Sequence, residues 1–366
     1  MRMVEWKKLG EICELERGVR VIKKDLQEEG LIPVYQNSLT PLGYFDKSNY
    51  PANTPFVICA GAAGEIGFCN KPFWAADDCT CILCSSSVNK KFIYYCLLVK
   101  QHTLKSQVRK ASVPRLSKEV IGKLIVPIPS MSEQERVVGI LDTFISSIDN
   151  LKQQIVQRRK QYEYYRDQLL NLEGKERVAI VPLREVVKSY CTGATPNKGH
   201  LEYYESGTIP WLRTQDVKFN EIYEIDSFVT EEAVAKTGVK WIPSNCVIVA
   251  ISGATAGRCA INKIPTTTNQ HCLNLEINPK KALYKYIYYC VYNAYSDMVS
   301  RKQGARGDLN SSIILGITIP VPSLSEQQRI VDILDKFEAS IQNLEAQLSQ
   351  REKQYEYYRN KLLTFE

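Results

Sequence analysis

The chain has few of the residues on which most catalytic and metal sites depend. It contains only 3 histidines among 366 residues, His102, His200 and His271, and none has a metal-ligand spacing. It lacks a G-x-G-x-x-G fingerprint and the Walker Lys-Ser/Thr pair that would hold nucleotide phosphates. We therefore predict a chain that is not an enzyme, with no bound metal and no cofactor of its own.

Long apolar runs are also missing. No stretch approaches 18 apolar residues, and the opening MRMVEWKKLG lacks the apolar core of a signal peptide. We therefore expect a cytoplasmic protein whose 12 cysteines are buried thiols. The tightest cysteine group, Cys79, Cys81 and Cys84, alternates along an apolar run that is typical of a strand. A zinc site there is the weaker alternative, because no second cysteine pair or nearby histidine completes it.

The most informative feature that is present is an internal duplication. Residues 127–173 return as residues 320–366 without a gap, and about 29 of the 47 aligned positions are identical. This period is far too long for a solenoid of short repeats. The duplication indicates a chain of two similar halves, each a globular segment followed by the repeated stretch.

The repeated stretch has the period of a coiled-coil helix. Each copy opens with Pro-x-Pro, which would end the preceding segment, and Ser132 with Glu135, or Ser325 with Gln328, would then form a capping box. We predict two helices of about 40 residues, or roughly 60 Å, that pair antiparallel about a pseudo-twofold axis. A surface helix on one large domain is the less favoured alternative. The seam positions, spaced by alternating fours and threes, are Val137, Leu141, Phe144, Ile148, Leu151, Ile155, Arg158, Tyr162, Tyr165 and Leu169, with Ile330, Leu334, Phe337, Ile341, Leu344, Leu348, Arg351, Tyr355, Tyr358 and Leu362 in the copy.

Two pairs of residues in these helices depart from a plain coiled coil. Arg158 and Arg351 place a charge in the seam, where it can fix the register, recruit a carboxylate or extend to solvent. Tyr164 and Tyr357 fall on the opposite side, where a two-stranded coil needs nothing apolar. They are candidates for docking helices of a partner protein, and a solvated tyrosine is the alternative.

The globular segments look like weaker copies of each other. Each opens with an apolar strand pattern (residues 4–12 and 180–187), continues to a polar loop after Ile-Pro, and has a Tyr-rich helical segment and a closing strand. We predict a mixed α/β domain in each half. Gly61, Gly64 and Gly67 indicate a tight turn between strands where glycine permits positive φ, and contact of this turn with a DNA phosphate is the alternative.

Positive charge is concentrated in these two segments. The net charge of the chain is +7, whereas both helical repeats are slightly acidic. Basic residues set among Ser, Gln, Asn and Gly suit phosphate neutralisation beside short polar groups that reach base edges, and a solvated basic face is the alternative. The predicted DNA-contacting residues are Gln36, Asn37, Arg109, Lys110 and Arg115 for one half-site, and Arg213, Gln215, Arg301, Lys302 and Arg306 for the other.

The duplicated P-x-P-S-x-S-E-Q-x-R helix, the I-P-W-x-R-x-x-D loop at 209 and the S-G-A-T-x-G turn at 252 resemble the specificity subunit of type I restriction-modification systems. The resemblance covers essentially the whole chain. In the first half, however, the turn is AGAAGEIG in place of the usual S-G-A-T form.

This resemblance implies an α+β fold with two target recognition domains, residues 1–126 and 174–319, separated by spacer helices in residues 127–173 and 320–366. It implies a non-catalytic subunit that binds double-stranded DNA at a bipartite, asymmetric target. It also implies two methyltransferase subunits, one on each repeat, which bring S-adenosylmethionine, and restriction subunits that join through the complex. The alternative is a coiled-coil scaffold that joins proteins without reading DNA.

Overall fold

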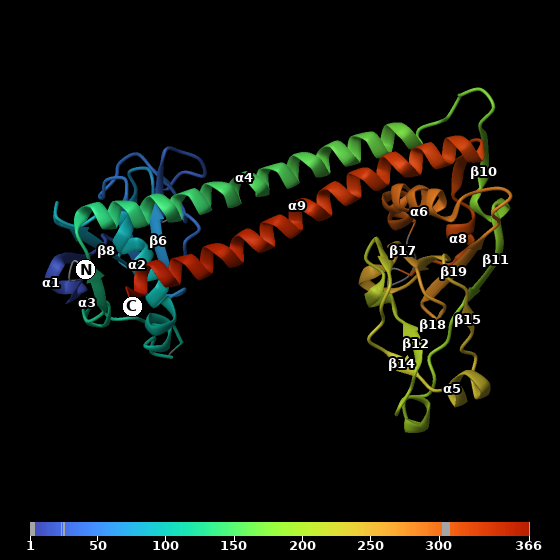
Figure 1. Cartoon of the computed structure of the whole chain (residues 1–366), viewed down its shortest axis with the longest axis horizontal. Helices are drawn as coiled ribbons and strands as arrows, with labels where there is room; N and C mark the ends of the chain where they lie inside the picture. The colour runs from blue at the N-terminus through green and yellow to red at the C-terminus, as the bar shows by residue number, and fades with distance from the viewer. Residues whose placement is uncertain (1–3, 23, 25, 111, 302–307, 366) are drawn as a thin grey trace. The chain divides into compact units, whose positions relative to one another are not determined.

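A computed structural model describes residues 4–22, 24, 26–110, 112–301 and 308–365. The chain divides into two compact units, unit 1 with residues 1–153 and 345–366, and unit 2 with residues 154–344. Each unit combines β-sheets, shorter helices and parts of two long helices (Figure 1), which confirms the predicted α+β class. Within the described part of the chain, no helix is long and apolar enough to cross a membrane.

The two long helices have the predicted length. Helix α4 (Met131–Leu170) has 40 residues and α9 (Leu324–Thr364) has 41. The predicted capping boxes are wrong, because Ser132 and Ser325 lie inside the first turn. The residue before α9, Ser323, caps it instead, and its hydroxyl accepts a hydrogen bond from the Glu326 amide at 3.3 Å. The S-x-S sequence offers two candidate caps, and the first serine is used.

The long helices pack antiparallel within each unit. In unit 1, Lys152 of α4 pairs with Glu352 of α9 at 3.4 Å, and the rings of Phe144 and Tyr358 stack at 5.4 Å. In unit 2, the Tyr162 hydroxyl donates a hydrogen bond to Glu338 at 3.1 Å. The buried seam positions are Val137, Leu141, Ile148, Ile155, Tyr162, Ile330 and Leu334.

The globular part of unit 1 consists of mainly antiparallel sheets covered by a helix, with one parallel pair, β3 with β7. Its main sheet has the order β2-β8-β5-β6 and its small sheet the order β4-β3-β7, while β1 pairs with β9. Helix α1 (Leu9–Ile12) ends the strand expected over residues 4–12, because Leu9 turns its side chain into the core. The elements are β1 (Glu5–Lys8), β2 (Cys13–Arg17), β3 (Ile32–Tyr35), β4 (Gly43–Phe45), β5 (Thr54–Ile58), β6 (Ile66–Cys69), β7 (Trp74–Ala75), β8 (Cys79–Cys84), α2 (Lys90–Ser106), α3 (Lys118–Gly122) and β9 (Ile125–Ile128).

Unit 2 has the same plan with additional strands. Its sheets have the orders β11-β19-β16-β17-β13 and β14-β12-β18-β15, and β10 pairs with β20. The strand expected over residues 180–187 is interrupted by a 3-10 turn, η2 (Leu183–Glu185). The other elements are β10 (Ala179–Pro182), β11 (Val187–Thr192), η3 (Leu201–Tyr203), β12 (Ile209–Leu212), η4 (Thr214–Asp216), β13 (Asn220–Ile222), β14 (Phe228–Val229), α5 (Glu231–Lys236), β15 (Trp241–Ile242), β16 (Val247–Ala250), η5 (Gly253–Thr255), β17 (Cys259–Asn262), β18 (Thr266–Thr268), β19 (Cys272–Ile277), α6 (Tyr284–Asn293), α7 (Tyr295–Ser300), α8 (Ser311–Leu315) and β20 (Thr318–Val321).

The globular part of each unit is attached to a long helix by the same polar triad. In unit 1, Asp142 of α4 accepts hydrogen bonds from Lys91 at 2.8 Å and Tyr95 at 2.5 Å, both on α2. In unit 2, Asp335 of α9 pairs with Lys285 at 2.9 Å and accepts a hydrogen bond from the Tyr289 hydroxyl at 2.5 Å, and both partners lie on α6.

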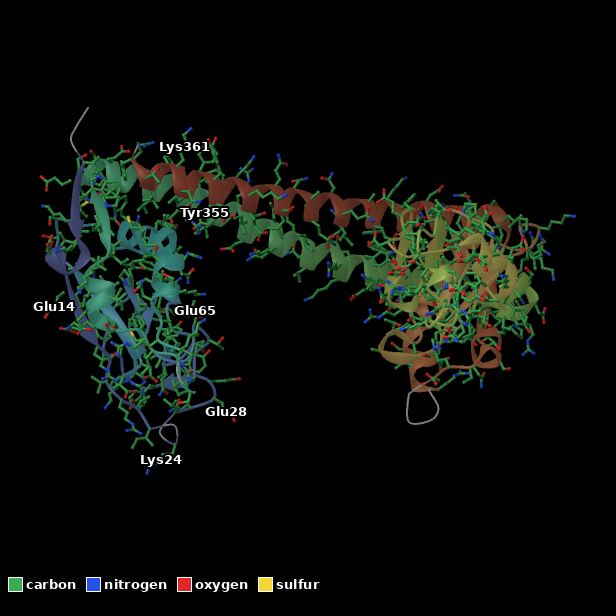
Figure 2. The ribbon with its side chains drawn as sticks, turned by 90° about the horizontal axis from the view of Figure 1, so that it is seen from below. Glu14, Lys24, Glu28, Glu65, Tyr355 and Lys361 are labelled. Atoms are coloured by element: carbon green, nitrogen blue, oxygen red, sulfur yellow. The ribbon has the colours of Figure 1, made fainter. Side chains whose placement is uncertain are left out.

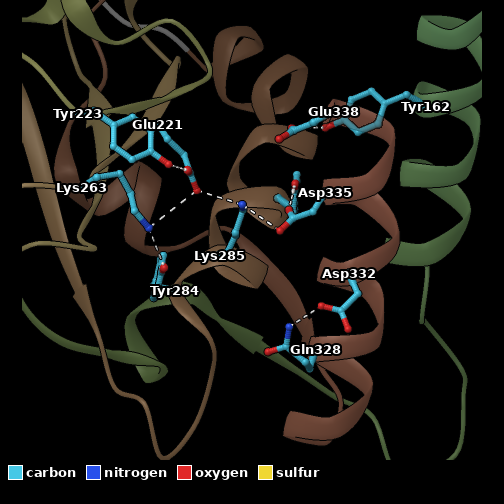
Figure 3. Close-up of polar contacts among 11 residues, drawn as sticks. Tyr162, Glu221, Tyr223, Lys263, Tyr284, Lys285, Gln328, Asp332, Asp335 and Glu338 are labelled. Carbon is cyan, nitrogen blue, oxygen red and sulfur yellow. Dashed lines mark hydrogen bonds and ion pairs between the residues drawn. The ribbon is translucent and has the colours of Figure 1, made fainter. Parts of the chain in front are cut away.

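Lys285 also pairs with Glu221 of β13 at 3.0 Å (Figure 3). Burial opposes the protonated amine, but hydrogen bonds to Asp335 and Glu221 outweigh it and raise the pKa of Lys285 well above its usual value. The lysine that links β13, α6 and α9 therefore stays charged. This lysine bridge fixes the additional strand of unit 2 against the long helix.

The repeated E-Q-x-R motif forms a second attachment. Its Glu and Arg pair on the surface, Glu133 with Arg136 at 2.6 Å in unit 1 and Glu326 with Arg329 at 2.7 Å in unit 2. The Gln between them is buried, and its carbonyl oxygen accepts a hydrogen bond from a backbone amide that begins or precedes the shorter helix. This contact is made by Gln134 to Asn89 and by Gln327 to Leu283, both at 2.9 Å.

Candidate nucleic-acid interface

In unit 1, three segments that are distant in sequence meet where the strands end. The Asn37 carbonyl accepts a hydrogen bond from the Ala62 amide at 2.9 Å. The Gly61 amide donates to the Pro114 carbonyl at 3.2 Å, and Arg115 forms a bridge with Ala60. We call the loop residues 36–37, 60–64, 77–78 and 109–115 that the structure describes loop cluster 1.

The cations of loop cluster 1 lie on a closed loop. Arg109 donates its amide to the Arg115 carbonyl at 2.9 Å, and the Arg115 amide returns a bond to the Arg109 carbonyl at 3.3 Å. Arg109, Lys110 and Arg115 are all exposed. Three exposed positive charges on a loop fixed by backbone hydrogen bonds can contact phosphates without a large loss of conformational freedom.

Both units have a strand-to-strand turn with positive-φ glycines, but the assignment of Gly67 to the first turn is wrong, because Gly67 lies in β6 and has no positive φ. Gly61 and Gly64 have φ of 78° and 88°, and Gly253 and Gly257 have φ of 73° and 92°. A side chain at Gly61 would meet the Asn37 carbonyl oxygen at 2.8 Å. The first turn therefore keeps the geometry of the second despite its different sequence, AGAAGEIG.

In unit 2, loop cluster 2 consists of the described residues in 213–216, 251–257, 269–271 and 308–309. The Ile251 amide donates to the His271 carbonyl at 2.9 Å, and the Leu309 amide donates to the Ile251 carbonyl at 2.8 Å. Arg213 directly follows β12, and its amide donates to the Asp216 carboxylate at 2.9 Å.

The remaining predicted DNA contacts of unit 2 have different environments. Gln215 is exposed within η4. Arg301 follows α7 and pairs with Asp297 at 2.8 Å, so its charge is partly compensated within the chain. Lys302 and Arg306 lie outside the described residues.

Corresponding backbone hydrogen bonds align the two clusters. The Ala76 amide donates to the Tyr35 carbonyl at 2.8 Å, as the Asn269 amide does to the Leu212 carbonyl at 2.9 Å. The donors lie two residues before Asp78 in unit 1 and two residues before His271 in unit 2. The acceptors lie directly before Gln36 in unit 1 and directly before Arg213 in unit 2. Position 36 therefore corresponds to position 213, and position 78 to position 271.

The aligned positions carry different side chains. Glu65, labelled in Figure 2, has Arg258 as its counterpart, because their carbonyls accept equivalent bonds at 2.8 and 2.9 Å. Likewise Asp77 and Asp78 are replaced by Gln270 and His271. The sequence prediction missed these four residues, although D-D-C at 77 and Q-H-C at 270 each precede a buried strand and could have indicated the correspondence.

The cysteines near loop cluster 1 lie in the predicted strand β8. Burial raises the pKa of the Cys79 and Cys81 thiols well above the usual value, so both stay protonated. Among the residues that the structure describes, no group of three His, Cys, Asp or Glu could hold a metal ion.

The two tyrosines predicted to bind a partner belong to exposed aromatic ladders. In unit 2, Tyr164 is 61% exposed and packs edge-on against Tyr165, which stacks on Phe337 at 5.4 Å. Arg158 lies 5.9 Å from the Phe337 ring centroid, so this seam arginine packs on an aromatic ring. We call Arg158, Tyr164, Tyr165 and Phe337 tyrosine face 2.

Unit 1 repeats this ladder as tyrosine face 1, formed by Phe144, Arg351, Tyr357 and Tyr358. Tyr357 is 58% exposed and packs edge-on against Tyr358, which stacks on Phe144. Lys361, labelled in Figure 2, lies 5.6 Å from the Tyr357 ring centroid. Both seam tyrosines, Tyr165 and Tyr358, therefore stack on a phenylalanine of the facing long helix and still remain exposed.

Comparison with known proteins gives consistent results across the whole chain. The sequence matches the family described as "Type I restriction modification DNA specificity domain" over residues 2–158 and 175–352. It is 32% identical over 388 residues to the specificity subunit of the type I restriction enzyme EcoR124I/EcoR124II of Escherichia coli, covering 99% of this chain and 94% of that protein.

A putative type I restriction enzyme specificity subunit of Haemophilus influenzae is 27% identical and is covered to 96% of its length. Among solved structures, the S subunit of a type I restriction-modification system from M. genitalium aligns with a TM-score of 0.68 at 18% identity, covering 99% of this chain and 96% of that one. At that identity the structural likeness concerns the fold alone.

Proposed function

The chain belongs to the family of type I restriction-modification DNA specificity proteins, and on this basis we propose that it reads a bipartite, asymmetric DNA target as the specificity subunit of a methylating complex. The observation that carries the proposal is the pair of loop clusters. They share backbone hydrogen bonds and glycine turns but differ at the aligned side chains. Two loop clusters with the same backbone arrangement but different side-chain donors and acceptors suit two half-sites of different sequence.

In this proposal, residues 1–126 and 174–319 act as the two target recognition domains, and residues 127–173 and 320–366 as the conserved helices. Phosphate contacts come from exposed cations such as Arg109, Lys110 and Arg115, which fix the position on the duplex. In the same proposal, Gln36, Asn37, Arg213 and Gln215 contact bases. The subunit supplies recognition and no catalytic group, and it acts in the cytoplasm, where the cell's DNA is its substrate.

We further propose that each tyrosine face docks one methyltransferase subunit, so that two bind per chain. An exposed tyrosine beside stacked rings provides apolar area with a polar edge, as protein interfaces favour. In unit 2, a pocket of about 180 Å³ lined by Arg158, Ile333, Lys336 and Phe337 could receive an apolar side chain of the partner. Restriction subunits would join through the methyltransferase subunits.

Selection from random double-stranded DNA tests the DNA-reading part of this proposal. The full chain, alone and with its methyltransferase partner, should enrich two different short sequences at a fixed separation. Binding should weaken steeply with added salt, because several phosphates are neutralised. Enrichment of no sequence, together with intact methyltransferase binding, would instead support a coiled-coil protein scaffold.

A further inference from the structure

The two loop clusters carry different side chains at one pair of aligned positions, 36 and 78 in unit 1 and 213 and 271 in unit 2. In loop cluster 1, the Gln36 amide donates to a carboxylate oxygen of Asp78 at 3.4 Å. The glutamine donor thus has an acceptor from its own chain. The second carboxylate oxygen and the glutamine carbonyl remain as acceptors that can face a base.

In loop cluster 2, the same pair of positions holds Arg213 and His271. The guanidinium carbon of Arg213 lies 6.0 Å from the Trp211 ring centroid. Its Nε is buried, and among the described residues it has no hydrogen-bond partner. His271 cannot replace the carboxylate of Asp78, and its ring Nε2 lies 3.1 Å from the Gln270 amide nitrogen.

An arginine donor buried without an acceptor loses its hydration and gains no bond in return. A ligand cannot reach this buried Nε, but no ion pair among the described residues engages the Arg213 guanidinium, so its terminal amino groups remain as donors for an acceptor that a ligand supplies. The Trp211 ring beside the guanidinium limits the side chain, and the hydrogen bond from the Arg213 backbone amide to Asp216 fixes the backbone that carries it. Such restriction lowers the entropy lost on binding.

We propose that Arg213 reads a guanine in the major groove of the second half-site, and that this position therefore differs between the half-sites. Guanine offers O6 and N7 as two acceptors that match the planar guanidinium fork. The aligned position of the first half-site takes a base with an exocyclic amino group, because Gln36 and Asp78 together present acceptors there. This inference rests on the proposed DNA-reading function.

The test is selection from random DNA with the full chain and three variants. Arg213→Gln should lose the guanine preference at one position of one half-site and leave the other half-site unchanged. Its affinity for the wild-type target should fall about 5- to 150-fold. Arg213→Lys keeps the charge but lacks the fork, so it should lose the same preference. Arg184→Gln, a matched change at an exposed arginine of η2 in the same unit that is not among the predicted DNA contacts, should keep the guanine.

Transferring the unit 2 residues to the aligned positions of unit 1 distinguishes a change of base preference from loss of folding. Gln36→Arg with Asp78→His should introduce a guanine into the first half-site, which a damaged protein cannot do. If Arg213→Gln weakens binding equally for all sequences and lowers the salt slope by about 1, Arg213 contacts a phosphate and the inference is overturned.

The selection with the wild-type chain distinguishes failure of the guanine assignment from failure of the proposed DNA-reading function. A split sequence that stays unchanged in both Arg213 variants overturns the base assignment and leaves the proposed function standing. A wild-type selection with no enriched sequence overturns the proposed function and, with it, the base assignment.

Discussion

Replacing Gln327 by Met should destabilise unit 2 at the start of α9. The Gln327 side chain is 0% exposed. Its carbonyl oxygen accepts from the Leu283 amide at 2.9 Å, and its amide donates to the carbonyls of Pro322 at 2.9 Å and Lys281 at 3.3 Å. Met preserves the volume but offers no comparable donor or acceptor. The Leu283 amide and the Pro322 carbonyl then lose their partners, at about 1 to 3 kcal/mol each, so we expect a total of about 2 to 6 kcal/mol.

Urea unfolding, together with hydrogen exchange of the Leu283 amide, measures this effect. Protection of that amide should fall in Gln327→Met, because its acceptor is gone. Gln328→Met is the matched control: Gln328 is exposed and bonds only Asp332 among the contacts described, at 2.7 Å, so its loss should cost less than about 0.5 kcal/mol. Equal effects of the two substitutions would refute the reasoning.

Three further predictions concern stability and assembly. Burial raises the pKa of Glu338 despite the hydrogen bond from Tyr162. The stability that the folded protein gains from the protonated Glu338 carboxyl is therefore fully present below pH 4.5, and it is lost as the pH rises through the raised folded-state pKa. Glu338→Gln should therefore gain stability over the wild type as the pH rises from 4.5, and a pH-independent difference in urea unfolding would contradict this. Gly253→Ala should lower the free energy of unfolding by about 1 kcal/mol through its positive φ alone, since nothing lies within 4 Å of the added carbon. The carbon added in Gly257→Ala also meets Tyr295 at 3.2 Å, so this variant should lose more stability in thermal unfolding. The reverse order would count against the turn geometry. Tyr164→Ala with Tyr357→Ala should weaken methyltransferase binding at unchanged thermal stability, and native mass spectrometry finding only one bound methyltransferase in the wild type would contradict the two-site proposal.

The sequence was sufficient for features that depend on local periodicity. The heptad spacing predicted two helices of about 40 residues, and the glycine spacing predicted the turn at Gly61 and Gly64. These features follow from contacts or backbone angles that recur along one segment, which is why a repeat makes them visible.

Features that depend on distant segments could not be predicted in the same way. The triad of Asp142, Lys91 and Tyr95 joins residues about 50 positions apart, and Gln134 reaches Asn89 across 45. The pairing of Gln36 with Asp78 needs two loops to meet after the sheet has formed. A residue type alone does not reveal such a contact, although the recurrence of Asp, Lys and Tyr in the second half at nearly the same offset was a usable signal for the triad.

Methylation mapping tests the central claim most directly. The chain would be expressed with its methyltransferase partner in a host whose DNA otherwise lacks that methylation, and the genome would be sequenced for modified adenines. The account predicts one new split motif with two different halves at a fixed gap, and its absence when the chain is omitted. Methylation at the same sites without the chain, or at a single unsplit sequence, would contradict it.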